Sequence, residues 1–218
     1  MSNEIFKWQP QMLDTDEKVN YNVISSGFEN GMTQRGLLSD RETTSFTFVY
    51  KHKLLEPGAV LTLKNEIKDF FNDRHGSYDN FFLPSWKLDG VISDAITTAD
   101  NTFKLGKDPS YLGFSKTLCE AGNYIYICKR FAKGFEVPTT VHEIRRITDW
   151  SGSGDDWTVT VDSTFDNDYD ASTSVQKAYK VFFKHPELPS SFAIPYVVEF
   201  SLEFVEDLAS LYQSDFGV

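Results

Sequence analysis

The stretch SFTFVYKHKLLEPGAVLTLKNEIKDFFNDRHGSYDNFFLPSW, residues 45–86, decides the fold that the sequence predicts. It begins with an alternation of period two, in which Phe46, Phe48 and Tyr50 share one face, as is typical of a half-buried strand. A second alternating run lies at residues 193–206, near the end of the chain. Because a long amphipathic strand needs a sheet to join, we expect these two strands to pair.

A helix follows the first of these strands. Pro57 suits the first position of a helix, and Gly76 is placed to end it. Between them, apolar residues recur every three or four positions, as in an amphipathic helix that packs on a sheet. They are Val60, Leu63, Ile67, Phe70 and Phe71, whereas Lys64, Glu66, Lys68, Asp69 and Asp73 are expected to face water. A short aromatic strand comes next, and Pro84 ends it or places it at a sheet edge.

After Trp86, short β-like segments alternate with turn-forming clusters and predict an all-β region. The expected strands are at residues 95–98, 102–105, 123–131, 140–148, 157–162 and 177–183, and the linkers SGSGDD and FDNDYDASTS are expected to form hairpins or exposed loops. The fold class is therefore mainly β. A discontinuous β-sandwich-like domain with one α-helix, residues 1–86 and 178–218, is interrupted by an inserted β-barrel or β-sandwich, residues 87–177. The first twenty residues predict a polar arm or loose strand that leads into a strand at 19–25.

Composition limits the classes of function. The 218 residues include 32 acidic and 21 basic side chains, for a net charge of -11 and a pI near 4.8. This balance argues against binding nucleic acid by neutralising its phosphates. No run approaches the roughly 18 apolar residues of a membrane span, and the first residues do not resemble a signal peptide, so we expect a soluble protein made in a cytoplasm. Cys119 and Cys128 are expected to be free thiols.

The sequence contains no recognisable catalytic motif. There is no nucleophile elbow, zinc-binding HExxH or phosphate-binding loop, and the four histidines are scattered. Asp166, Asp168 and Asp170 alternate as calcium ligands do, but Ala171 and Lys177 stand where a calcium loop has Gly and Glu. A solvated acidic loop is the preferred interpretation. We therefore expect no catalytic residue, no metal and no cofactor.

Tryptophans are the remaining candidates for a binding site. Trp150 and Trp157 lie in the β region and could stack against a sugar ring. Aromatic residues in a β-rich chain more often belong to the core or to an interface, and that interpretation stays open beside the first.

The order of three motifs resembles a known family. GFENGMTQR precedes the alternating strand, GSYDNFFLP follows the helix, and FSLEF closes the chain. The matching residues are Gly27, Phe28, Asn30, Gly31, Gln34, Arg35, Gly76, Tyr78, Phe81, Phe82, Leu83, Pro84, Phe200, Leu202, Glu203 and Phe204. Together they resemble the phage minor tail and distal tail proteins, among them the tail-tip protein M of lambdoid phages. The resemblance covers residues 20–86 and 178–206, so it does not extend to the inserted region.

The resemblance implies a non-enzymatic structural subunit of a tail tip or baseplate in the virion, assembled in the host cytoplasm. Such subunits form a homomeric ring, with a hexamer preferred over a trimer, that connects the tail tube to the hub proteins and lets the genome pass without specific DNA binding. The expected interface residues are Arg35, Asp40, Arg41 and Glu42. The alternatives are a carbohydrate-binding tail module that uses Trp150 or Trp157 and, less favoured, a glycan hydrolase.

Overall fold

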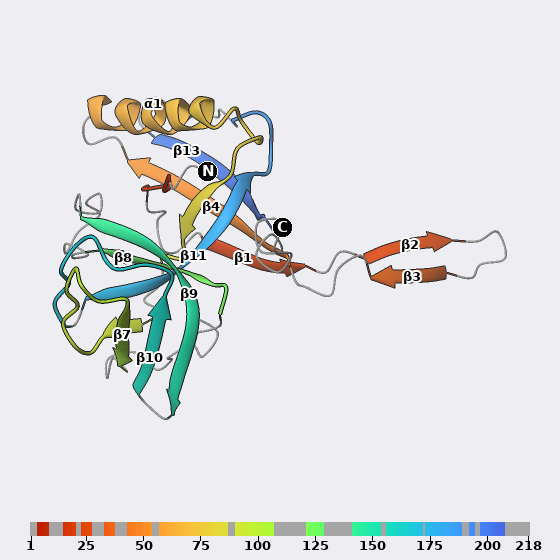
Figure 1. The fold of residues 1–218 in the computed structure, drawn as a ribbon. Coiled ribbons are helices and arrows are strands. Elements are labelled where there is room, and N and C mark those ends of the chain that lie inside the picture. Colours follow the sequence, from red (N-terminus) through yellow and green to blue (C-terminus); the bar gives the residue numbers. More distant parts are fainter. Residues whose placement is uncertain are drawn as a thin grey trace. The chain divides into compact units, whose positions relative to one another are not determined.

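The described part of the chain is mainly β, with one helix (Figure 1). The computed structural model describes residues 4–8, 15–20, 23–27, 33–37, 43–53, 57–86, 90–106, 121–128, 141–153, 156–171, 173–188, 192–194 and 197–207. The chain divides into two compact units. The barrel unit comprises residues 1–9 and 81–180, and the helix unit comprises residues 10–80 and 181–218. From the sequence we predicted the corresponding domain boundaries at 86/87 and 177/178. That prediction assigned the N-terminal residues to the domain that contains the helix.

The barrel unit contains a closed antiparallel barrel of six strands. In order around the barrel they are β11 (Ser174–Phe183), β6 (Gly90–Ile92), β7 (Thr102–Gly106), β10 (Asp156–Val161), β9 (His142–Ser153) and β8 (Tyr124–Cys128). Pairing of β8 with β11, in which Ile127 lies opposite Val175, closes the ring of strands. Of the two architectures that the sequence left open, the barrel is the observed one. Closure leaves no unprotected sheet edge within this ring.

Side chains fill the barrel, as expected for six strands. On β7, Phe103 and Leu105 point inward and are buried, while Thr102 and Lys104 are exposed. The other strands contribute mainly aliphatic residues to the same core. The buried cluster consists of Ile92, Ile96, Phe103, Leu105, Ile125, Ile127, Ile147, Val159, Val161, Phe165, Tyr169 and Val175. These side chains form the hydrophobic core of the barrel.

The N-terminal residues pack on the barrel unit. Ile5 forms a parallel bridge with Phe82 in β5 (Phe81–Pro84), which itself pairs with β11. The Phe6 amide donates to the carbonyl of Phe82, and the Phe82 amide donates to the carbonyl of Glu4, both at 2.8 Å. Phe6 is completely buried. The prediction of a loose polar arm is therefore wrong for residues 4–8, because two aromatic side chains in this short segment, Phe6 and Trp8, have a core to join.

The helix unit is built on the strand pair that the sequence predicted. β4 (Thr43–Lys53) pairs with β13 (Val197–Glu206) along nine residue pairs, and β1 (Thr15–Asn20) lies on the other side of β4. β12 (Phe192–Ile194) and the last residues of β11 pair with β13 as well. In the register, Phe48 faces Leu202 and Phe46 faces Phe204, so the apolar faces of both strands coincide. All four of these side chains are buried.

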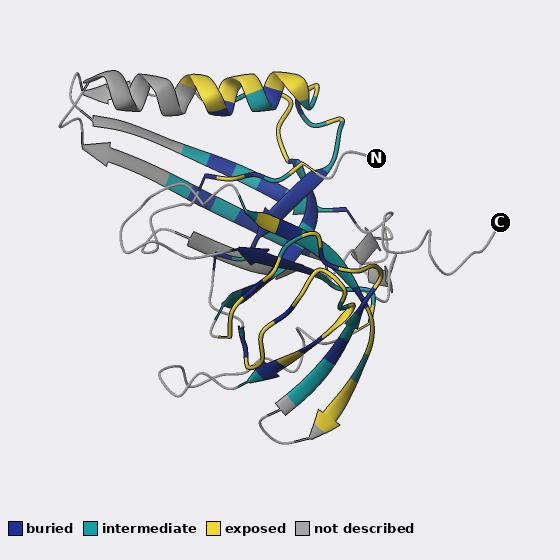
Figure 2. Cartoon of the chain, turned by 60° about the vertical axis from the view of Figure 1, so that its left-hand side comes forward, coloured by how far each residue is buried: buried dark blue, intermediate teal, exposed yellow. Residues whose placement is uncertain are grey.

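The helix α1 (Pro57–Asp73) covers this sheet, as Figure 1 shows beside β4 and β13. Phe71 packs against Phe183 with ring centroids 4.9 Å apart, and Phe183 in turn lies 5.3 Å from Phe204. Ile67 is also buried. The opposite side of the described part of α1 is exposed (Figure 2), at Glu66, Lys68, Asp69 and Asp73. The predicted amphipathic helix is confirmed at these residues.

Two short strands differ from the prediction. The single strand expected at 19–25 is two strands, β1 and β2 (Val23–Gly27), and β2 pairs only with β3 (Thr33–Leu37) among the described residues, in a separate two-stranded sheet. The strand expected at 95–98 is an isolated bridge between Ile96 and Tyr169, whereas β6 lies earlier, at Gly90–Ile92. Runs of three to five residues hold too few alternations to fix their bounds.

Replacing Gly76 by Ala should destabilise the helix unit. Gly76 has a φ of +68°, and an added Cβ would lie 3.2 Å from the Phe71 ring and 3.4 Å from the Pro186 carbonyl oxygen. We expect a loss of about 2 kcal/mol in the free energy of unfolding, measured by chemical denaturation, from the backbone cost and the crowding together. Gly122→Ala is the matched control, because Gly122 has a φ of +94° but an added Cβ there would meet only Arg146 Nη2, at an ordinary contact distance of 3.8 Å. An equal or larger loss for Gly122→Ala would contradict the role of crowding.

Candidate functional site

The predicted interface residues lie in and after the two-stranded sheet of the helix unit. Arg35 is in β3, opposite Ser25 of β2 in the backbone register. Asp40, Arg41 and Glu42 lie outside the described residues, as does Cys119. The resemblance segment GFENGMTQR therefore spans the end of β2, the connection and the first half of β3.

Trp150 and Trp157 are neighbours on the paired strands β9 and β10. Their ring centroids are 4.9 Å apart, and the ring planes are inclined by 53°. Both side chains are half-buried and pack against the core cluster of the barrel. A sugar-stacking platform needs an aromatic face open to solvent, whereas these two rings cover part of each other. The geometry favours the core interpretation, and the carbohydrate role stays a prediction.

The acidic loop at residues 162–171 does not bring its carboxylates together. Asp166 binds Arg145, and the Asp168 carboxylate accepts from the backbone amide of Thr98 at 3.0 Å. Asp170 is exposed and uses its backbone carbonyl to bind Thr173. The described residues contain no group of three or more side chains placed to hold a metal ion. The calcium interpretation therefore has no geometric support.

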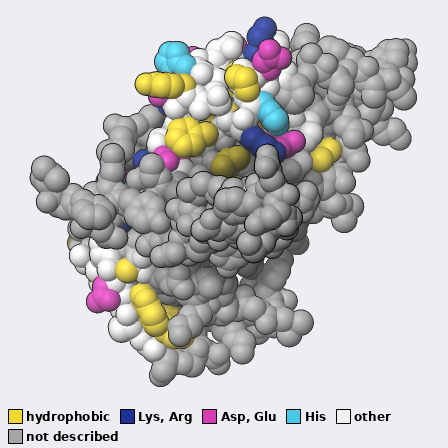
Figure 3. All heavy atoms as spheres, turned by 90° about the vertical axis from the view of Figure 1, so that its right-hand side faces the viewer, with side chains coloured by type: hydrophobic (Ala, Val, Ile, Leu, Met, Phe, Trp, Pro, Cys, Tyr) yellow, Lys and Arg dark blue, Asp and Glu magenta, His cyan; other side chains and the backbone are white. Residues whose placement is uncertain are grey.

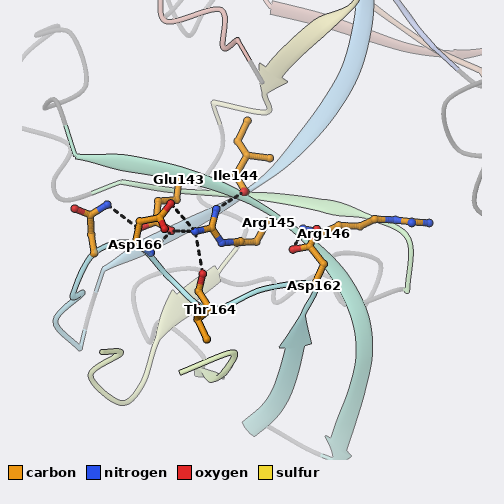
Figure 4. Close-up of polar contacts among 8 residues, drawn as sticks. Glu143, Ile144, Arg145, Arg146, Asp162, Thr164 and Asp166 are labelled. Atoms are coloured by element: carbon orange, nitrogen blue, oxygen red, sulfur yellow. Dashed lines mark hydrogen bonds and ion pairs between the residues drawn. The ribbon is translucent and has the colours of Figure 1, made fainter. Parts of the chain in front are cut away.

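The loop is instead held by a buried ion pair, Glu143 with Arg145 (Figure 4). Arg145 Nη2 lies 2.6 Å from Glu143 Oε2 and 2.9 Å from Asp166 Oδ2, and it also donates to the carbonyl of Thr164 at 3.0 Å. The side chain of Glu143 is 3% exposed and that of Arg145 is 13% exposed. We call this arrangement the barrel clamp.

Glu143 uses both carboxylate oxygens in the barrel clamp. Oε2 accepts from the backbone amide of Asp166 at 3.0 Å, and Oε1 accepts from the Asn167 side-chain amide at 2.7 Å. A buried carboxylate costs free energy unless charge and hydrogen bonds compensate it. Here the guanidinium supplies the charge, and the loop supplies the hydrogen bonds, so burial of Glu143 and the shape of the loop depend on each other.

The clamped loop carries two aromatic side chains into the barrel. Phe165 and Tyr169 are both buried, and their rings lie 6.2 Å apart. Tyr169 exchanges both backbone hydrogen bonds with Ile96, at 2.8 and 2.9 Å, and the Phe165 amide donates to the carbonyl of Asp100. Asp166, Asp168 and Asp170 are exposed, as the prediction of a solvated acidic loop requires, but the same loop also contributes to the core, which the prediction missed. The FxxxY spacing of Phe165 and Tyr169 was the signal in the sequence that could have indicated burial of this loop.

Burial raises the pKa of two tyrosines in the barrel unit. Desolvation raises the pKa of Tyr169, and the neighbouring Glu143 carboxylate raises it further. Desolvation likewise raises the pKa of Tyr126, with a smaller effect from Cys128. Burial also raises the pKa of the Cys128 thiol, which opposes formation of a nucleophilic thiolate. These groups are neutral at ordinary pH.

The arrangement of charged groups in the barrel unit is suited to holding a loop. A general acid and base need carboxylates that can exchange protons with a substrate, but Glu143 is covered by its own loop. His142 is exposed and stacks near Tyr126, with ring centroids 5.9 Å apart. The geometry of the barrel clamp therefore supports a structural role, in which an ion pair and hydrogen bonds hold the loop at residues 162–171 against the barrel.

No protein-family model matches the chain, and a search of curated proteins finds no match. Within the described residues, no helix combines the length and apolar character that would let it cross a membrane.

Removing the cation of the barrel clamp should destabilise the barrel unit strongly. Arg145→Ala leaves the Glu143 carboxylate buried without its charge partner, and breaking such a pair costs about 3 kcal/mol or more. The loss should appear in denaturant unfolding followed by tryptophan fluorescence. The control is Lys104→Ala, which removes an exposed pair with Asp94, 2.9 Å apart, and should cost less than about 1 kcal/mol. Equal losses for the two variants would show that the clamp does not fasten the loop.

Alkaline pH should destabilise the protein through its buried tyrosines. Because Tyr126 and Tyr169 have a raised pKa when folded, their stabilising contribution is complete below pH 10, the ordinary value. Above it, the unfolded chain loses these protons first, so stability falls as pH rises. The slope of unfolding free energy against pH between about 10 and 12 should be shallower in Tyr126→Phe and Tyr169→Phe than in the parent. An unchanged slope in both variants would contradict this assignment.

Proposed function

We propose that this chain is a non-enzymatic structural subunit of a bacteriophage tail tip or baseplate. Copies would form a homomeric ring, most simply a hexamer, between the tail tube and the hub proteins, with a central passage for the genome. The observation that carries the proposal is the separate β2–β3 sheet, because it lies in the segment that resembles distal tail proteins.

A two-stranded sheet supports assembly for a physical reason. Two paired strands alone are marginally stable in water, and both outer edges of the pair present backbone hydrogen-bonding groups. Among the described residues, β2 and β3 pair only with each other, and β1 lies at the end of its sheet with β4 as its one partner. Edges of this kind join chains by adding strand to strand.

A ring needs a head-to-tail contact between two different surfaces of the same chain. Among the described residues of the helix unit, the outer edge of β1 and the edges of the β2–β3 sheet have no strand partner, and they differ from each other as such a contact requires. The net charge of -11 adds a second consideration. An acidic wall would repel the phosphates of DNA and let the genome slide past without adhering.

The proposal is tested on virus particles. Mass spectrometry of purified particles encoded by the same genome should detect this chain in a stoichiometry of about one ring per tail, and electron microscopy should locate it at the tail tip. A second arm deletes residues 23–37, which should prevent tail completion and leave unjoined tail parts. Absence of the chain from purified tailed particles would refute the proposal.

A further inference from the structure

The described residues form no broad apolar patch on the face of the molecule shown in Figure 3. Their hydrophobic side chains lie there in separate small groups among charged and histidine side chains. Tyr78, at 80%, is the one large hydrophobic residue that is exposed among those whose burial the structure describes. Single exposed residues of this kind are ordinary on protein surfaces. A more specific surface is the edge of β5, which another segment of the barrel unit covers.

The edge of β5 holds residues 4–8 as an added strand. β5 pairs with β11, and Phe82 of β5 bonds through both of its backbone groups to this segment. The backbone contact consists of the parallel bridge to Ile5 and the two hydrogen bonds described above, to Glu4 and Phe6. A free strand edge pairs readily with an extended segment that reaches it. Residues 4–8 therefore occupy a position that a strand of another chain could take.

Side chains of the segment contact both faces of β5. Ile5 packs against the hydrophobic cluster that contains Phe82. Phe6 is completely buried, and its ring centroid lies 6.1 Å from that of Phe81 and 4.9 Å from that of Trp8. Because Phe81 and Phe82 are neighbours in a strand, their side chains point to opposite faces. The segment is thus recognised through Ile5 on one face and Phe6 on the other.

The remaining side chains of the segment are directed outward. Glu4 and Lys7 are exposed, and Glu4 contributes its backbone carbonyl to the contact. Peptide recognition by strand addition has this form, in which backbone hydrogen bonds give affinity and the buried side chains give specificity. The chain therefore contains both a strand-addition site, at β5, and a segment that fits it, Ile-Phe-Lys-Trp at residues 5–8.

We propose that the edge of β5 is a strand-exchange site, which accepts residues 4–8 of a second copy of this chain in place of its own. The contacts are the same in both arrangements, because the sequences are identical, and such exchange is a low-cost route to dimers. Departure of the segment breaks its own contacts only, while β5 stays paired with β11 and the six strands of the barrel stay closed.

Concentration decides which segment occupies the site. A tethered segment competes at an effective concentration of about 1 mM. The chain's own segment therefore prevails in dilute solution, and the segment of a second copy enters where copies are held together at comparable concentrations. The inference goes beyond the proposed function, because it requires neither a ring nor a virus particle.

A fluorescein-labelled peptide of residues 2–9, SNEIFKWQ, tests the site in the full-length protein by fluorescence anisotropy. The peptide should bind Phe6→Ala, whose own segment lacks the buried ring, and should bind the wild type about tenfold more weakly, because the wild-type segment competes. It should also raise the unfolding midpoint of Phe6→Ala, since a ligand of the folded state stabilises it. Ile5→Ala is a milder change that gives the same comparison if Phe6→Ala does not fold.

Two controls separate the segment from its surroundings. Glu4→Gln changes an exposed side chain and keeps the backbone carbonyl, so this variant should bind the peptide as the wild type does. A peptide that carries Phe6→Ala should bind at least about tenfold more weakly than the parent peptide, because it no longer buries the aromatic ring.

Exchange between full-length copies is measured in a mixture of chains with natural and with heavy isotopes, each carrying photoreactive benzoylphenylalanine in place of the exposed Lys7. At about 1 mM, irradiation should link position 7 of one isotopic form to the barrel unit of the other. Dilution to about 10 µM should leave links within one chain only, because the tethered segment then prevails. Excess unlabelled peptide should suppress the links between chains.

Any of three results would overturn the inference. The first is a peptide that binds the wild type and Phe6→Ala equally, which would place its binding elsewhere. The second is a wild type that takes up no peptide at about 1 mM, which would make residues 4–8 a permanent part of the core. The third is the absence of links between chains at the higher concentration. None of them bears on the tail role, which the particle experiment tests separately.

Discussion

Backbone pairing along β11 is the interaction on which both units depend. Its first residues pair with β6 and β8 and so close the barrel, while Val181–Phe183 pair with β13. Phe183 then packs between Phe71 of α1 and Phe204 of β13. A shift of this strand by one residue would exchange its inward and outward faces in both cores at once. The register of one strand is therefore fixed twice, by two sets of buried side chains.

The barrel unit adds a buried ion pair to its hydrophobic core. Glu143 and Arg145 form a pair whose net stabilisation is small compared with the cost of breaking it. Such a pair contributes most by excluding alternatives, since a different path of residues 162–171 would leave Glu143 buried without its partners. The acidic loop is ordered for this reason, although its sequence has the composition of a flexible linker.

Periodicity in the sequence was sufficient for the long elements and insufficient for the short ones. The alternation of β4 and β13 and the stripe of α1 were predicted, because each repeats its pattern several times. The hairpin of β9 and β10 was predicted from the composition of the SGSGDD segment. β6 has three residues and offers no period to detect. The barrel clamp was missed because its partners are 21 residues apart and polar, so no local pattern links Arg145 to Asp166. The sequence analysis named Tyr78 only as one of the residues that match the motifs of the tail-protein family.

The path of the chain has a practical consequence for handling the protein. Three crossings, after residues 9, 80 and 180, connect the barrel unit with the helix unit. A single protease cut between residues 9 and 15 would therefore release neither unit, because two covalent connections would remain. An affinity tag on the N-terminus would be attached next to the Glu4 and Phe82 hydrogen bonds. A fusion partner at that end would therefore be attached to the segment whose backbone pairs with β5 of the barrel unit.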